Sequence, residues 1–353
     1  MKTKKLFRVT VLACALGAWG CGDDKETEQT FDVSSRTLQV EVDERKVIEA
    51  TGNFEGNATY VSEDTNIATV NEFGGVEGIT EGTTKIIVSV GTGEKKKTVE
   101  VAVTVVAGTL PTPKGAWLFD DADDLFQARI GQALKPGQGG KDAADQAVDL
   151  LVPTTALSHF TAVAGRKTGD GAIRVDRGYF LEATHGIAAN GGGTMVNEYT
   201  VSWVIKFSDA AKWTGLLQTD PANSNDADCF VVDLGMGQSW SGRTDDKPIV
   251  NGQWHTLVFS MKCGEDGHGT KNIYYCDGVP LPVGYSKGEN TLQNIDDNRS
   301  LDLATVLFLA DNDGEDPENT DGVANTVEVS DIRIWDRALT DDDVQKLHVK
   351  LNK

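Results

Sequence analysis

The chain has 353 residues, of which 39% are hydrophobic, and its formal net charge at pH 7 is −21. This length suffices for two ordinary domains, and the hydrophobic fraction is that of a folded chain. The acidic excess repels nucleic acid and anionic membrane surfaces at long range, which argues against both as direct partners. With 38 glycines and many short runs of Val, Ile and Thr, the composition is typical of an all-β protein.

Residues 1–20 have the composition of an export signal, in which a basic MKTKKLFR precedes the apolar VTVLACALGAWG. The segment resembles a bacterial lipoprotein signal with lipidation of Cys21, although the usual Leu is missing three residues upstream. Cys14 is a rival lipidation site, and an ordinary secretory peptide is the alternative. Residues 21–30 are acidic, which predicts a solvated tether. The expected location is the cell surface at the outer membrane, with the lipid anchor as the only membrane contact.

Residues 31–107 alternate between apolar and polar positions with a period of two, broken by Gly, Asn and Asp, which predicts a small β-sandwich. IATV at 67–70, the Gly-Val pair at 75–76 and GTT at 82–84 resemble the group 2 bacterial immunoglobulin-like (BIG2) domain. The resemblance implies a spacer or adhesion module without an active site. Two prolines in GTLPTPK predict a stiff linker at 108–114.

Residues 115–353 form the predicted second domain. A helix is expected after Thr340, a natural N-cap, with Asp341 at its positive end and one apolar face of Val344, Leu347 and Leu351. The predicted strands are GAWLF, YTVSWVIKF, TGLLQT, CFVVDLGM, WHTLVFSMK, NIYYCDG, TVLFLA and VEVSDIRIWD.

This second domain resembles the laminin-G-like, concanavalin A-like jelly roll. The pieces that carry the resemblance include GDGAIRVDRGYFLEATHGI, NGQWHTLVFSMK and VEVSDIRIWDRALTDDDVQKL. The expected fold is all-β: an Ig-like sandwich, then a jelly-roll sandwich, then a short C-terminal helix. Because that fold hosts lectins, glycanases and inert modules alike, the resemblance is specific for fold and weak for function.

No catalytic residue is predicted. Sandwich glycanases of this superfamily carry acids on one strand in an E-x-D-x-x-E pattern. EVDERK starts the pattern at Glu41 but ends on Lys46, and Pro317 argues against a central strand in EDPENTDG. A divergent glycan hydrolase therefore stays an alternative.

A structural Ca²⁺ is one interpretation of the acidic run at 308–322, where Asp311, Asp313, Glu315 and Asp316 offer the hard oxygen ligands that this cation takes. The spacing excludes an EF-hand, because a Gly at the sixth position would place Thr320 at the twelfth. A solvated turn without metal is the other interpretation, since Asx residues favour turns by themselves.

Exposed tryptophans are the main signal for sugar binding, because their faces stack on pyranose rings. The residues proposed to bind ligand are Trp213, Asp220, Asn223, Asp228 and Trp240, two aromatics near loops with polar neighbours. Four tryptophans within strand patterns are expected in the core: Trp117, Trp203, Trp254 and Trp335.

Three cysteines follow Cys21, and an odd number does not indicate a disulfide framework. Cys263 and Cys276 flank a predicted hairpin but out of register, so buried thiols are expected, with pairing of these two left open. The predicted function is a cell-surface lipoprotein that binds an extracellular ligand without catalysis, with glycan as the leading class. The alternatives are an adhesion protein that binds a surface protein, and the divergent hydrolase.

Overall fold

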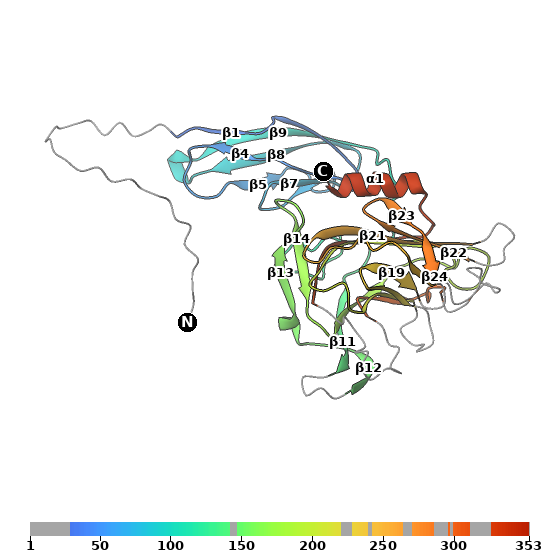
Figure 1. The fold of residues 1–353 in the computed structure, drawn as a ribbon. Helices are drawn as coiled ribbons and strands as arrows, with labels where there is room; N and C mark the ends of the chain where they lie inside the picture. The colour runs from blue at the N-terminus through green and yellow to red at the C-terminus, as the bar shows by residue number, and fades with distance from the viewer. Residues whose placement is uncertain are drawn as a thin grey trace, which may run out of the picture.

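The computed structural model describes residues 29–141, 147–219, 228–238, 242–263, 270–285, 296, 299–310 and 326–352. In this described part, nearly all regular structure is β-strand, and the one α-helix is α1 (Asp341–Asn352). Figure 1 shows a small sandwich of blue strands above a larger sandwich, with the red helix α1 beside both. No helix of the described residues has the length and apolar character needed to span a membrane.

The first sandwich pairs a four-stranded sheet, ordered β2-β9-β8-β5, with a three-stranded sheet, ordered β3-β7-β6, while β1 pairs with β4. In β9 every second residue is buried, from Val99 to Val105, which confirms the predicted period of two. The strands are β1 Phe31–Val33, β2 Thr37–Glu41, β3 Arg45–Val47, β4 Ala50–Gly52, β5 Thr59–Ser62, β6 Ala68–Val70, β7 Gly75–Gly78, β8 Gly82–Val90 and β9 Lys97–Val106.

The second sandwich has an eight-stranded sheet, ordered β13-β14-β26-β16-β21-β22-β23 with β10 also paired to β26. These strands are β10 Gly115–Trp117, β13 Phe160–Ala164, β14 Gly171–Val175, β16 Tyr199–Phe207, β21 Trp254–Cys263, β22 Thr270–Cys276, β23 Val279–Leu281 and β26 Val327–Trp335. Its facing sheet has nine strands, ordered β12-β11-β15-β25-β17-β18-β19-β20-β24. They are β11 Lys135–Lys141, β12 Ala147–Pro153, β15 Tyr179–Thr184, β17 Thr214–Gln218, β18 Asp228–Val232, β19 Gly235–Gln238, β20 Gly242–Thr244, β24 Val283–Tyr285 and β25 Thr305–Phe308.

The main core lies between these two sheets. Trp203 of the central strand β16 and Trp117 of β10 are completely buried there. The Trp117 ring meets Phe308 of the facing sheet edge-on, with ring centroids 5.5 Å apart. Such large apolar contacts between sheets supply the main driving force for folding a sandwich of this size.

Helix α1 covers the outer face of the eight-stranded sheet. The Asp343 N–H donates to Thr340 Oγ1 at 3.2 Å, and the Thr340 N–H donates to Asp343 Oδ2 at 3.1 Å, which is a reciprocal cap of the helix start. Val344 and Leu347 are buried against a second apolar cluster, and Leu351 is partly buried there. The predicted N-cap and apolar face are therefore confirmed.

Two local predictions were wrong. CFVVDLGM is a hairpin rather than one strand, because Asp233 and Leu234 both have positive φ, 53° and 65°, and turn the chain between β18 and β19. Trp254 is half-buried rather than in the core, with the Lys206 ammonium 4.9 Å from its ring centroid.

Cys229 and Cys276 are both buried, and Cys276 is a buried thiol as expected. The hairpin register pairs Cys276 with Leu257 and Cys263 with Thr270. The two strand positions therefore do not face each other, as the sequence predicted.

Candidate functional site

Most of the predicted site residues lie outside the part of the chain that the structure describes. One predicted position, Asp228, has a described backbone at the start of β18 but no described side chain. Trp213 is thus the predicted ligand-binding side chain that the structure places. The predicted lipidation, ligand and metal residues outside the described part are Cys21, Asp220, Asn223, Trp240, Asp311, Asp313, Glu315 and Asp316.

Trp213 lies at the outer face of the nine-stranded sheet, immediately before β17. Its ring stacks on Phe230 of β18, with centroids 3.8 Å apart and an interplanar angle of 31°. Cys229 and Val231 point into the core on either side of Phe230, so alternation along the strand directs Phe230 to the opposite face. Trp213 is half-buried, and its indole Nε1 is buried without a hydrogen-bond partner in the described structure.

Phe230 continues a row across this face. It pairs with Gly237 of β19, which in turn pairs with Arg243 of β20. The guanidinium carbon of Arg243 lies 5.6 Å from the Phe230 ring centroid. A Cβ atom at Gly237 would come within 2.7 Å of that ring, so glycine lets the ring lie close to the backbone. We call Trp213, Phe230 and Arg243 the aromatic row.

A second ring lies on the same sheet face in the same way. Phe180 of β15 belongs to a small buried cluster with Leu307 and Ala310, apart from the main core. A Cβ atom at Gly137 of β11 would lie 2.1 Å from the Phe180 ring. On this face, aromatic rings therefore cover glycines of neighbouring strands at two places.

Sequence reasoning found Trp213 but missed Phe230 and Arg243. The alternation of CFVV around Phe230 was visible, but it could not show which face pointed inward. Arg243 lies 13 residues further along the chain, and only the β18-β19-β20 register brings it into the row.

A cluster of His255, Cys276 and Asp277 could suggest a metal or catalytic centre, because their ligand atoms all lie within 4.8 Å of one another. The geometry argues against both. His255 Nε2 accepts the Val250 N–H at 3.0 Å, so the ring proton sits on Nδ1, which donates to Asp277 Oδ2 at 2.8 Å. Both ring nitrogens are thus occupied, and neither offers a lone pair to a metal.

The cysteine of this cluster is equally unsuited to catalysis. Cys276 Sγ lies 3.7 Å from the same Nδ1 that binds Asp277, whereas a triad places nucleophile and carboxylate at opposite ring nitrogens. Burial, followed by the neighbouring Asp277, raises the pKa of the Cys276 thiol and keeps it protonated. The cluster is a structural feature of the β22–β23 turn.

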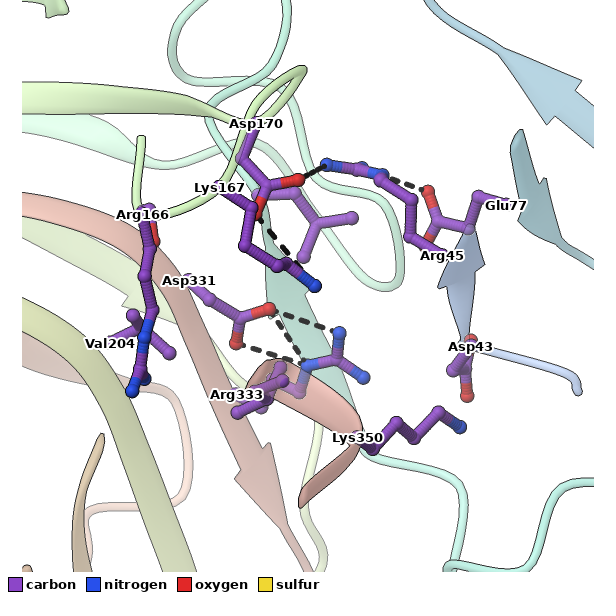
Figure 2. A pocket seen from close by; sticks show the side chains of 13 residues that line it. Asp43, Arg45, Glu77, Arg166, Lys167, Asp170, Val204, Asp331, Arg333 and Lys350 are labelled. Atoms are coloured by element: carbon purple, nitrogen blue, oxygen red, sulfur yellow. Dashed lines mark hydrogen bonds and ion pairs between the residues drawn. The ribbon is translucent and has the colours of Figure 1, made fainter. Parts of the chain in front are cut away.

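Charged residues also line a small cavity of about 40 Å³ between the two sandwiches. Figure 2 shows side chains from both sandwiches and from α1 converging on it. A cavity of this size has room for ordered water and not for a sugar ring. Its charged lining residues are Asp43, Arg45, Glu77, Arg166, Lys167, Asp170, Asp331, Arg333 and Lys350.

Comparison with protein families identifies the first sandwich. Residues 29–101 match the model of the bacterial Ig-like domain (group 2). This confirms the BIG2 resemblance for that domain, which is hereafter called the Ig-like domain. No curated protein matches the chain.

Solved structures give a looser likeness. The chain is similar to Trypanosoma rangeli sialidase in complex with the inhibitor DANA, with 12% identity and a TM-score of 0.41, covering 85% of this chain and 46% of that one. It is also similar to the botulinum neurotoxin serotype D ligand binding domain in complex with N-acetylneuraminic acid, with 13% identity and a TM-score of 0.36, covering 61% and 50%. This chain spans about half the length of those structures, and the likeness concerns the β-sandwich fold alone.

Proposed function

We propose that this protein is a cell-surface lipoprotein whose second sandwich binds an extracellular glycan without catalysis. The observation that carries the proposal is the aromatic row, in which a half-buried Trp213 stacks on Phe230 and an exposed Arg243 follows. Aromatic faces supply apolar contact area while few rotamers are frozen, and neighbouring polar groups orient the ligand.

The position of the row fits a binding face. Helix α1 packs on the outer side of the eight-stranded sheet, against Tyr275 and Trp335. The Ig-like domain lies on the same side of that sheet, where residues of both domains line the cavity near Arg333. The aromatic row belongs to the other sheet, on its outer side. Ligand access to that face is therefore not blocked by either element (Figure 1).

Trp213→Ala is expected to weaken glycan binding tenfold or more, which is about 1.4 kcal/mol, because it removes the outer ring of the stack. A glycan array followed by titration of the strongest glycan measures this. Trp254→Ala is the matched control, since Trp254 is also half-buried but lies on the other sheet, under Lys206. Equal binding by wild type and Trp213→Ala, or an array without any bound glycan, would contradict the proposal.

The anchor is proposed from the sequence alone, since Cys21 lies outside the described residues. Cys21→Ser is expected to move the protein from the membrane fraction to the soluble fraction, because the lipid chain would be the only membrane contact. Fractionation and immunoblotting measure the shift, and Cys14→Ser is the control for the rival site. A mutant Cys21→Ser that stays with the membranes would refute the lipidation of this residue.

Calcium in the acidic run that holds Asp311 and Asp313 likewise remains a proposal. A cation bound only to the folded state raises the midpoint of unfolding by mass action. A higher midpoint of unfolding in millimolar Ca²⁺ than in chelator is expected for a structural cation. The same midpoint under both conditions would identify the run as a solvated turn.

A further inference from the structure

We infer that Arg45 is the centre of an ion lock that holds the Ig-like domain against the second sandwich, so that the two domains move as one body. This goes beyond the proposed function, because the sequence predicted a spacer or adhesion module and a stiff linker but no contact between the two domains. The contacts of Arg45 and of its neighbours join segments that lie far apart in the chain.

The Arg45 guanidinium, on β3 of the Ig-like domain, meets three carboxylates. Glu77 of the same domain lies 3.3 Å away, and Asp170 of the second sandwich lies 3.2 Å away (Figure 2). Asp120 of the second sandwich binds through both of its oxygens, one of them at 2.9 Å. A planar guanidinium matched to a carboxylate in this two-point manner fixes orientation as well as distance.

The second sandwich holds its two carboxylates in place by itself. Asp120 Oδ1 accepts the Gly171 N–H at 2.8 Å, which ties the segment after β10 to the start of β14. Phe119, just before Asp120, has a φ of 53°, and a Cβ atom at Gly171 would lie 2.2 Å from the Phe119 carbonyl oxygen. The close approach of these two segments therefore holds the carboxylates of Asp120 and Asp170 in position to bind Arg45.

Burial makes the lock depend on its arginine. Only 14% of the Arg45 side chain is exposed, and the side chains of Glu77, Asp120 and Asp170 are similarly covered. Burial raises the pKa of Asp120 to about 6, although Arg45 acts in the opposite direction. Without Arg45, the three buried carboxylates would lie close together with less positive charge to balance their negative charges. Like charges at such distances repel strongly.

Further contacts surround the lock. Arg129 Nε of the second sandwich lies 3.2 Å from Glu77 Oε1, so Glu77 is shared between two arginines. Asn71 Nδ2 donates to the Gly169 carbonyl oxygen at 2.7 Å. On the other side of the cavity, Lys350 of α1 donates to the Val42 carbonyl oxygen at 2.8 Å. The Ig-like domain is therefore held from several sides, as a rigid joint requires.

The linker at 108–114 is also fixed. Trp335 Nε1 donates to the Pro111 carbonyl oxygen at 2.8 Å, and the Lys114 N–H donates to the Ile334 carbonyl oxygen at 2.7 Å. Leu110 packs against the apolar cluster under α1. Because the linker lies against the second sandwich, little free chain is left to let the domains swing apart.

The test is small-angle X-ray scattering of the full chain with Arg45→Met, which keeps the length of the side chain and removes its charge. The scattering of the wild-type protein is expected to fit the docked arrangement, and Arg45→Met is expected to shift to a larger maximum dimension. Arg36→Met is the matched control, because Arg36 pairs with Asp32 at the exposed surface of the same domain. It is expected to scatter like the wild type.

A second variant guards against unfolding of the Ig-like domain in Arg45→Met. Asp120→Asn combined with Asp170→Asn opens the lock from the other side and leaves the Ig-like sequence intact. It is expected to show the same shift in maximum dimension, with the melting of the Ig-like domain retained. If this double variant keeps the dimensions of the wild type, or if the wild type already scatters as two freely moving domains, the ion lock is refuted.

Discussion

Replacing Trp203 by alanine is expected to lower the free energy of unfolding by about 3–5 kcal/mol, the usual cost of deleting a buried tryptophan side chain. Trp203 lies in the middle of β16, completely buried between the two sheets of the second sandwich. The flanking strands β21 and β26 are hydrogen-bonded to it, so the space left by the ring cannot easily collapse. Denaturant unfolding of the full chain measures the change.

Trp203→Phe is the control for this prediction. The indole Nε1 of Trp203 is buried without a hydrogen-bond partner in the described part of the chain. Phenylalanine keeps an aromatic ring and removes that unsatisfied donor. Trp203→Phe is therefore expected to lower the free energy of unfolding clearly less than Trp203→Ala does. Equal losses for the two variants would show that ring packing is not what Trp203 contributes.

Arg333→Met is expected to lower the free energy of unfolding by about 3–5 kcal/mol, because it leaves the buried Asp331 carboxylate without its partner. The two side chains, 6% and 7% exposed for Arg333 and Asp331, are two positions apart on β26 and so lie on the same face of the strand. Arg333 Nε and a terminal nitrogen each bind an oxygen of Asp331 at 3.0 Å. The double variant Asp331→Leu with Arg333→Met is expected to recover most of the loss, since it removes both charges together.

The loss in Arg333→Met should also depend on pH. Burial raises the pKa of Asp331, with Arg333 acting in the opposite direction. Without Arg333, the folded state holds a proton on Asp331 more tightly than the unfolded state does, so stability falls as pH rises. Arg333→Met should therefore be less destabilised at pH 5 than at pH 8. A surface control, Lys85→Met, breaks an exposed pair with Glu100 and is expected to leave the free energy of unfolding nearly unchanged at either pH, because water screens exposed ion pairs.

The sequence was sufficient where a signal is local. Alternation identified β9, and Thr340 gave the start of α1, because period and capping depend on neighbours within a few positions. The BIG2 motif at 67–84 was sufficient for the first domain, which the family model then matched.

The sequence was insufficient where geometry joins distant residues. Arg45 meets Asp120 and Asp170 across 75 and 125 positions, and nothing local marks any of the three as a partner. Phe230 meets Trp213 through the pairing of β18 with β17, strands that are separate in sequence. Phe230 meets Gly237 through a hairpin whose turn, Asp233 and Leu234, lacks the glycine or asparagine that usually signals a left-handed pair. Side-chain partners of this kind follow from strand register, which the whole fold decides.

The fixed linker changes where the second folding unit begins. A fragment cut at Gly115 would lose the Pro111 carbonyl that accepts the Trp335 indole N–H, and it would lose Leu110 from the apolar cover of α1. A fragment that starts near Gly108 keeps both. The residues that join the two domains in sequence thus belong physically to the second one, and grafting that sandwich onto another protein requires carrying them along.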